Sequence, residues 1–320
     1  MMKLVVLERN TVGTDIDVSS FEQFGDVTYY KNTVKEEVEK NVGDADIIIA
    51  NKAPINQETI GNCPNVKMVC EFATGFDNVD LEYCQKRGIA VTNVVDYCTD
   101  SVAQHTFAMA LFLFEKLHYY DNYVKSGAYG AQDKFSNFDR QFFELSGKTW
   151  GIIGLGNIGK KVANIAKAFG CRVIYYSVTG KNTCPDYENV SLDTLLKEAD
   201  VLSIHCPLSD LTRNLIDKAA LCKMKKTALL INVARGAVVN NADLAWAINE
   251  NVIAGAGLDV LDGEPIRIDN PLNDIKDSEK LIITPHMAWG SVEARTRIVD
   301  AACENIRAFL NGDKRNRVDL

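Results

Sequence analysis

The turn Gly154-Leu155-Gly156-Asn157-Ile158-Gly159 has the Gly-x-Gly-x-x-Gly spacing of a phosphate-binding loop. That spacing also arises by chance in loops, but here it follows an apolar run and opens a helix-like stretch. Gly154 would permit the tight turn, Gly156 would let a pyrophosphate approach the backbone, and Gly159 would let helix and strand pack closely. Free N–H groups and the positive end of the helix dipole would hold the anion. We therefore expect a dinucleotide cofactor here, with Asn157 and Ile158 beside it.

The strand that follows this helix, at 172–176, ends without the acidic residue that bonds the ribose 2'-hydroxyl of NAD in many such sites. Ser177 stands at its end. Without a carboxylate, a 2'-phosphate is not repelled, and Ser177, Thr179, Lys181 and Asn182 could bond one. Both NAD and NADP are therefore open as the cofactor.

Short apolar runs alternate with helix-like stretches along the chain, which predicts βαβ units and an α/β fold with mostly parallel sheets. The expected strands lie near 3–7, 46–50, 67–70 and 89–92 in a first series, and near 148–153, 172–176, 201–205, 228–232, 253–258 and 281–283 in a second. A last helix, 291–310, begins after the second series has ended. It could pack back on the first lobe and make that lobe discontinuous.

Residues 100–117 follow Asp100, a good N-cap residue, and carry small or apolar side chains on most faces. We expect a buried helix there, between lobes or between subunits. The segment 118–145 is polar, aromatic and too irregular to assign.

The length of 320 residues and the 47% hydrophobic content favour two packed domains. A net charge of -8 without a basic run argues against nucleic acid or an anionic membrane as partner. The longest apolar stretch, 106–114, is too short to span a bilayer, and no signal peptide is expected. Nine cysteines without a Cys-x-x-Cys pair indicate reduced thiols and a cytoplasmic protein, and the histidines lack metal-ligand spacing, so we expect no metal.

Several further motifs occur in order along the second half of the chain. They are Leu202-Ser203-Ile204-His205-Cys206-Pro207-Leu208, Asn232-Val233-Ala234-Arg235-Gly236, Gly257-Leu258-Asp259-Val260, Glu264-Pro265 and Thr284-Pro285-His286-Met287-Ala288-Trp289. Together with the glycine turn they resemble the D-isomer-specific 2-hydroxyacid dehydrogenase family over nearly the whole chain.

The resemblance implies two domains with doubly wound parallel sheets. A flavodoxin-like, discontinuous substrate-binding domain would comprise residues 1–100 and 290–320. A Rossmann-type dinucleotide-binding domain would comprise residues 101–289. The family's active site lies in the cleft between the two domains, and its members form homodimers.

The resemblance also implies a catalytic set of Arg235, Glu264 and His286, and these residue types suit the chemistry. Hydride transfer to a 2-keto acid builds negative charge on the carbonyl oxygen, so the site needs a proton donor that titrates near neutral pH, as histidine does. A carboxylate from Glu264 would favour the imidazolium form and select its tautomer. The planar fork of Arg235 could bind the substrate carboxylate and polarise the carbonyl. His205 lies in an apolar strand and is expected to be a core histidine.

The remaining contacts are implied by the resemblance alone. Cofactor contacts fall to Cys206 and Pro207 on the adenine side and to Val233, Ala234 and Asp259 on the nicotinamide side, although Asp259 also fits a strand-end cap. The loop 72–80 would hold the substrate carboxylate by backbone N–H groups at Ala73, Thr74 and Gly75. Asn51, Lys52 and Trp289 are further substrate-binding candidates.

The sequence His286-Met287-Ala288-Trp289 is similar to the His-x-x-Trp form found in glycerate dehydrogenases, also called hydroxypyruvate reductases. A small 2-keto acid such as hydroxypyruvate or glyoxylate is therefore the favoured substrate. A D-lactate or aryl-lactate dehydrogenase of the same family is the first alternative. A corepressor-like protein that binds the dinucleotide without turnover is the second.

Overall fold

The computed structural model describes residues 1–320, which form two compact units. Unit 1 comprises Met1–Cys98 and Gly290–Leu320, and unit 2 comprises Thr99–Trp289. The first boundary thus lies slightly before the expected position after residue 100, and the second coincides with the expected one before residue 290. No helix in the chain combines the length and the apolar character needed to cross a membrane.

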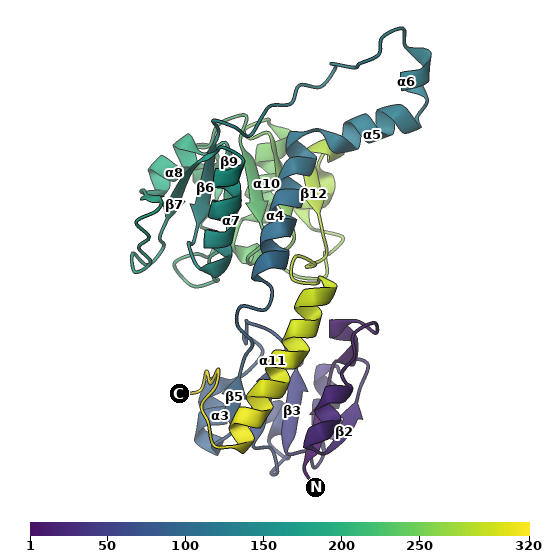
Figure 1. Ribbon diagram of the computed structural model, residues 1–320, viewed down its shortest axis with the longest axis vertical. Coiled ribbons are helices and arrows are strands. Elements are labelled where there is room, and N and C mark those ends of the chain that lie inside the picture. Colours follow the sequence, from purple (N-terminus) through teal and green to yellow (C-terminus); the bar gives the residue numbers. More distant parts are fainter. The chain divides into compact units, whose positions relative to one another are not determined.

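Unit 1 is built on a parallel five-stranded sheet with the order β2-β1-β3-β4-β5, which is the flavodoxin-like order (Figure 1). Its strands are β1 (Lys3–Val6), β2 (Asp26–Tyr29), β3 (Ile47–Ala50), β4 (Met68–Glu71) and β5 (Ala90–Thr92). Its helices are α1 (Val38–Val42), α2 (Gln57–Ile60), α3 (Leu81–Arg87) and α11 (Val292–Leu310), with 3-10 turns η1 (Arg9–Val12), η2 (Ser19–Phe24) and η3 (Lys35–Glu37).

The inner strands β3 and β4 are buried at every position, as expected for parallel strands covered on both faces. The last helix, α11, begins after the N-cap Ser291 and crosses one face of this sheet, where it contacts β4 and η2 (Figure 1). Its fully buried Asn305 donates from Nδ2 to the carbonyl oxygen of Asn93 over 2.8 Å. The C-terminal segment therefore completes the fold of the N-terminal one.

Unit 2 is built on a parallel seven-stranded sheet with the order β12-β11-β10-β9-β6-β7-β8, which is the Rossmann order extended by one strand. Its strands are β6 (Thr149–Ile153), β7 (Arg172–Tyr176), β8 (Glu188–Asn189), β9 (Val201–Ile204), β10 (Leu229–Asn232), β11 (Gly255–Leu258) and β12 (Leu281–Ile283). Its helices are α4 (Thr99–Phe114), α5 (Leu117–Lys125), α6 (Ala128–Ala131), α7 (Asn157–Ala168), α8 (Leu192–Glu198), α9 (Lys218–Leu221) and α10 (Asn241–Asn249), with η4 (Gly236–Val238), η5 (Pro271–Asp274) and η6 (Ser278–Lys280).

Helices cover both faces of the second sheet, so the predicted doubly wound α/β fold is confirmed for this unit. Apolar side chains of α8, α9 and α10 form one cluster with the strands on one face. Helices α4 and α7 lie side by side on the other face (Figure 1). The approach of α4 is close, because a Cβ atom added to Gly257 would lie 3.1 Å from the Cβ atom of Met109.

The expected helix 100–117 is α4, and it differs from the prediction at both ends. It begins at Thr99, so Asp100 lies in its first turn and forms an ion pair with Lys161 over 2.8 Å rather than acting as N-cap. It ends at Phe114, and Lys116 has a left-handed backbone (φ 56°) that separates it from α5. Part of the segment 118–145, for which the sequence predicts no element, is thus helical.

Strands β2 and β8 were not predicted. Both lie at sheet edges, and the residues of both are exposed or half-buried. An edge strand that is covered incompletely lacks the continuous apolar run by which the other strands were recognised.

Candidate active site

The glycine turn has the geometry expected of a phosphate-binding loop. Gly154 has φ 90°, and a Cβ atom there would lie 2.8 Å from the backbone nitrogen of Cys206. A Cβ atom on Gly159 would collide with the carbonyl oxygen of Gly154, whereas one on Gly156 would meet nothing within 4 Å. Gly156 is the N-cap of α7 and supplies no side-chain cap. The space above Gly156 is open, whereas Gly154 and Gly159 are closely packed. This arrangement fits a pyrophosphate bound at the N-terminus of α7.

The loop after β7 forms a local turn. Ser177 is buried, and its Oγ accepts a bond from the backbone N–H of Asn182 at 3.3 Å. Thr179 Oγ1 accepts a bond from the backbone N–H of Lys181 at 3.4 Å. Thr179, Lys181 and Asn182 are exposed. The turn therefore presents a cation and two polar side chains, with no acidic residue between Ser177 and Asn182.

His286 and Glu264 come together. The Nδ1 atom of His286 lies 2.7 Å from Oε2 of Glu264, and the side chains are 29% and 36% exposed. Glu264 is itself held, because its Oε1 accepts a bond from the backbone N–H of Leu261 at 2.9 Å. With Nδ1 bonded to the carboxylate, Nε2 is the nitrogen left to face a ligand.

Asp259 holds the loop that carries His286. It follows β11, is buried, and accepts bonds at Oδ1 from Thr284 Oγ1 (2.5 Å) and the Met287 N–H (2.7 Å) and at Oδ2 from the Ala288 N–H (2.8 Å). Its carbonyl oxygen accepts a bond from the backbone N–H of His286 at 2.8 Å. His286 has φ 55°, a left-handed conformation that is uncommon for a non-glycine residue and that these bonds help to hold. The contact of Asp259 with a nicotinamide group stays a prediction.

Two residues of α4 that the sequence did not single out hold the same loop. His105 Nε2 lies 2.9 Å from Thr284 Oγ1 and 3.6 Å from Asp259 Oδ1. Ser101 Oγ donates to the carbonyl oxygen of Ala288 over 2.6 Å. These two residues are four apart on one helix face, and that spacing was the only sign of them in the sequence.

Arg235 precedes a glycine whose backbone closely approaches the Leu261 turn, which is the segment 261–264 that carries Glu264. A Cβ atom on Gly236 would collide with the backbone of Leu261 and Asp262. The partly buried Arg235 donates from Nη1 to the carbonyl oxygen of Ala234 over 2.8 Å and forms no ion pair within the chain. Its second terminal nitrogen therefore remains available to a carboxylate ligand.

The other predicted cofactor residues occupy the ends of neighbouring strands. Val233 and Ala234 follow β10, and Cys206 and Pro207 follow β9, where Cys206 is buried and Pro207 is exposed. Burial lowers the pKa of His205 to about 3, and its Nε2 lies 3.0 Å from Ser203 Oγ. Burial therefore favours the uncharged form of His205, whose Nδ1 atom has no hydrogen-bond partner, so the expected core histidine is only partly satisfied.

In unit 1 the predicted substrate residues lie on two loops at the carboxyl ends of β3 and β4. The Ala73 carbonyl oxygen accepts a bond from the Val94 N–H at 2.9 Å, and Thr74 Oγ1 donates to the Val94 carbonyl oxygen over 2.8 Å. Thr74 is exposed, and Ala73 and Gly75 are half-buried. This loop is therefore fastened at its start and accessible at its tip.

The second loop is held by an acid that the sequence analysis missed. Oε2 of the buried Glu8 accepts bonds from the backbone N–H groups of Asn51, Lys52 and Ala53 at 2.9, 2.8 and 2.9 Å. Asn51 is buried and Lys52 is exposed. The backbone of these residues is thus already occupied, which leaves their side chains to meet a ligand.

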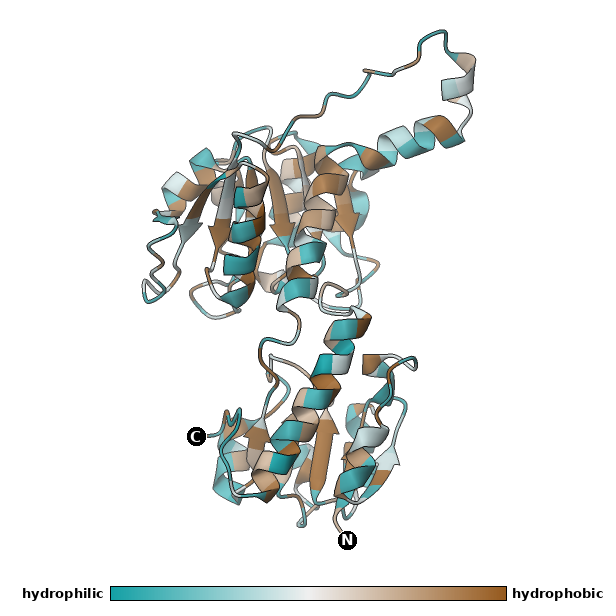
Figure 2. Cartoon of the chain, in the orientation of Figure 1, coloured by the Kyte–Doolittle hydropathy of each residue, from teal (hydrophilic) through white to brown (hydrophobic).

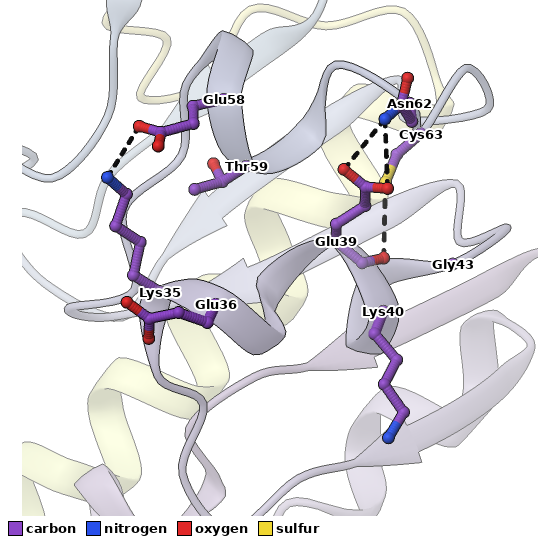
Figure 3. A pocket seen from close by; sticks show the side chains of 9 residues that line it. All are labelled: Lys35, Glu36, Glu39, Lys40, Gly43, Glu58, Thr59, Asn62 and Cys63. Atoms are coloured by element: carbon purple, nitrogen blue, oxygen red, sulfur yellow. Dashed lines mark hydrogen bonds and ion pairs between the residues drawn. The ribbon is translucent and has the colours of Figure 1, made fainter.

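A separate pocket of about 610 Å³ lies between α1 and α2 (Figure 3). Its polar groups engage one another: Lys35 forms an ion pair with Glu58 over 2.7 Å, and Asn62 donates to both carboxylate oxygens of Glu39. None of the predicted site residues lines it. We do not assign it a role in the chemistry.

Comparisons with known proteins identify related chains. Residues 107–288 match the family described as D-isomer specific 2-hydroxyacid dehydrogenase, NAD binding domain. The chain is 37% identical over 325 residues to a hydroxypyruvate reductase of Blautia hydrogenotrophica, covering 99% of this chain and 100% of that protein. It is 35% identical over 318 residues to a glycerate dehydrogenase of Methylorubrum extorquens, covering 99% of each. A D-lactate dehydrogenase structure from Aquifex aeolicus, complexed with NAD and lactic acid, matches with TM-score 0.86 and 29% identity over 99% of each chain.

The chain belongs to the D-isomer specific 2-hydroxyacid dehydrogenase family. The resemblance seen in the sequence motifs is thereby confirmed. Membership in this family gives the class of reaction, which is the nicotinamide-dependent oxidation of a 2-hydroxy acid or reduction of a 2-keto acid.

The close approach at Gly236 makes a prediction. In Gly236→Ala the added methyl group displaces the Leu261 turn, so Arg235 and Glu264 lose their relative placement and kcat/KM falls by about a hundredfold or more. Gly130→Ala is the control for the substitution itself, since a Cβ atom there meets nothing within 4 Å in the chain, and light scattering checks that this variant of α6 keeps the wild-type mass. Circular dichroism checks that both variants fold. Wild-type kcat/KM in Gly236→Ala would show that this contact does not position the site.

Proposed function

We propose that the protein reduces a small 2-keto acid, of the hydroxypyruvate or glyoxylate type, to the D-2-hydroxy acid. The observation that carries this proposal is the 2.7 Å contact between His286 and Glu264 in a unit that matches the family's NAD-binding domain. The names of the two full-length relatives, a hydroxypyruvate reductase and a glycerate dehydrogenase, support the substrate class.

In this proposal His286 is the proton donor and Glu264 holds it. Bonded through Nδ1 to Glu264, the ring presents Nε2 to the substrate and delivers the proton to the carbonyl oxygen as negative charge develops there. Arg235 binds the substrate carboxylate and polarises the carbonyl with its free nitrogen. In unit 1 the proposed substrate contacts are the backbone N–H groups of Ala73, Thr74 and Gly75 and the side chains of Asn51 and Lys52. In unit 2 the further proposed contact is the side chain of Trp289.

The cofactor supplies the hydride. Its pyrophosphate would be held by the turn Gly154 to Gly159, where the open side of Gly156 provides the space. Val233, Ala234 and Asp259 would lie near the nicotinamide, and Cys206 and Pro207 near the adenine. Because no acidic residue stands between Ser177 and Asn182, we propose that the site accepts NADPH as well as NADH.

We also propose that the protein is a homodimer formed through the arm 115–144, which comprises α5, α6 and the segment returning to the sheet (Figure 1). None of its thirty residues is buried within the chain. Phe135 and Phe138 are 90% and 83% exposed, and hydrophobic residues recur along the arm (Figure 2). A second copy of the chain is the partner that would cover this surface.

The nine cysteines support the expected cytoplasmic location. All are free thiols, and all but Cys184 and Cys222 are buried. Buried, unpaired thiols are typical of proteins from reducing compartments.

The substrate proposal is tested with hydroxypyruvate, glyoxylate, pyruvate and phenylpyruvate, each assayed with NADH and with NADPH. We expect hydroxypyruvate or glyoxylate to give the highest kcat/KM, with the two cofactors within about tenfold, or about 1.4 kcal/mol. Preference for pyruvate or phenylpyruvate would favour the lactate or aryl-lactate alternative. Cofactor binding without turnover of any acid would favour the corepressor alternative.

A single substitution tests the proposed role of Arg235. Arg235→Lys keeps the charge but loses the planar fork, so we expect a folded protein whose kcat/KM falls by at least about tenfold. Arg172→Lys, at a half-exposed residue that pairs with Glu188 and Glu198, is the matched control. The measurement is kcat/KM of both variants. A near-wild-type kcat/KM in Arg235→Lys would show that Arg235 does not bind the substrate as proposed.

The dimer proposal is tested by light scattering. The wild type should have twice the mass of the chain, and the double variant Phe135→Ser, Phe138→Ser should shift toward the mass of one chain. Ile268→Ser is the control, because Ile268 is fully exposed in the same unit but outside the arm. A wild type with the mass of one chain contradicts the proposal.

A further inference from the structure

Glu71 is a fully buried acid at the point where β4 meets the proposed substrate loop 72–80. It pairs across the sheet with Ala50, at the carboxyl edge. It has no ion pair in the chain, and its Oε2 atom has no hydrogen-bond partner. An acid so placed costs folding free energy if it is ionised, so its presence calls for a reason other than stability.

The one partner of Glu71 is a side chain of the loop that follows it. Asn78 donates from Nδ2 to Glu71 Oε1 over 3.1 Å and to the carbonyl oxygen of Ala53 over 3.0 Å. The backbone of Asn78 continues this attachment, since its carbonyl oxygen accepts a bond from the Ile55 N–H at 2.8 Å. Asn78 therefore joins three segments: the loop 72–80, the segment after β3, and the end of β4.

The surroundings of Glu71 favour its uncharged form. Burial is the largest influence and raises the pKa of Glu71 to about 8. The negative charge of Glu8 also raises this pKa, whereas the hydrogen bond from Asn78 and the positive charge of Lys52 lower it. These are the charged groups that act on it from the ends of β1 and β3. The acids of the loop itself, Asp77 and Asp80, are exposed to solvent.

We propose that Glu71, as an uncharged carboxylic acid, is a positioning residue that fastens the loop 72–80 through Asn78. Loss of its proton strengthens the single bond from Asn78, but that bond does not replace the water that a buried ionised acid requires, so the loop loosens to admit water and substrate binding weakens. The ionised group would add an unpaired buried charge beside Glu8, and it would repel the anionic substrate held at Ala73 to Gly75. The released proton passes to solvent. This inference rests on the proposed function only in taking the loop as the site of the substrate carboxylate.

The isosteric variant Glu71→Gln separates charge from shape. The glutamine Oε1 can still accept the bond from Asn78, but the side chain cannot ionise. Glu37→Gln is the matched control, since Glu37 is an exposed glutamate of the same unit. Asn78→Ala removes the attachment itself and leaves Glu71 in place.

The first measurement is thermal stability as a function of pH. Because the pKa of Glu71 rises from 4.5 to about 8 on folding, the native state retains a proton that the unfolded chain has lost between these values. The free energy of unfolding therefore falls as pH rises from about 4.5 to about 8, and Glu71 causes no further fall above pH 8. We expect the Tm of Glu71→Gln to exceed that of the wild type by an amount that grows up to about pH 8 and then levels off. A difference that does not change with pH contradicts an uncharged Glu71.

The second measurement links Glu71 to the substrate. At about pH 6 the KM for the keto acid should be alike in the wild type and Glu71→Gln, and at about pH 9 it should be at least about threefold lower in Glu71→Gln. Taking the ratio of the two KM values at each pH cancels every effect of pH that both proteins share. The ratio of the wild-type KM to the KM of Glu37→Gln should stay near one at every pH. Asn78→Ala should raise KM at every pH.

Hydrogen exchange of the backbone of residues 72–80, compared between variants at the same pH, reports on the loop without catalysis. We expect faster exchange in the wild type than in Glu71→Gln at about pH 9 and equal exchange at about pH 6. If the protein reduces no keto acid, the proposed function fails while the stability and exchange measurements still test Glu71. If it turns over substrate but the KM ratio and the exchange are independent of pH, the attachment proposed for Glu71 is wrong and the proposed function stands.

Discussion

The geometry around His286 depends on the buried carboxylate of Asp259. Its two oxygens take up a hydroxyl and two backbone N–H groups of the segment 284–288. A hydrogen bond to a charged acceptor contributes roughly 1.5–3 kcal/mol. A left-handed backbone at a non-glycine residue costs about 1–2 kcal/mol. The three bonds therefore outweigh the strain at His286, which places a histidine in a turn that would otherwise favour glycine and brings its ring to Glu264.

That arrangement is possible because the strands are parallel, so their carboxyl ends share one edge of each sheet. In unit 2 the glycine turn follows β6, Ser177 follows β7, and Asp259 follows β11. Residues far apart in sequence meet there on short loops, and contacts such as that of Gly236 with the Leu261 turn set their spacing. The same rule applies in unit 1, where Glu8 follows β1 and Glu71 ends β4. Each unit concentrates its polar chemistry at one edge of an otherwise apolar sheet.

The sequence predicted most of this frame for a physical reason. A central parallel strand is buried on both faces, so β3, β4, β9 and β10 are mostly apolar, with at most one polar residue each, and this composition identifies them in the sequence. The edge strands β2 and β8 lack that burial and carry no such signal. Helix α5 was missed for a related reason, since it buries no side chain within the chain. Packing within the chain therefore places no constraint on the side chains of this helix.

The roles of acids at strand ends could not be predicted from the sequence. Three such acids, Glu8, Glu71 and Asp259, look alike in the sequence but have different hydrogen-bond partners in the structure. Glu8 and Asp259 each accept three bonds, from donors that lie 43 to 45 residues away for Glu8 and 25 to 29 residues away for Asp259. Glu71 accepts one bond, from a residue seven positions along. The number of donors that reach a carboxylate decides whether its charge is compensated, and that number is set by the fold rather than by the residues beside it. Three donors reach the carboxylate of Glu8 and three reach that of Asp259, whereas the single donor, Asn78, leaves a charge on Glu71 uncompensated.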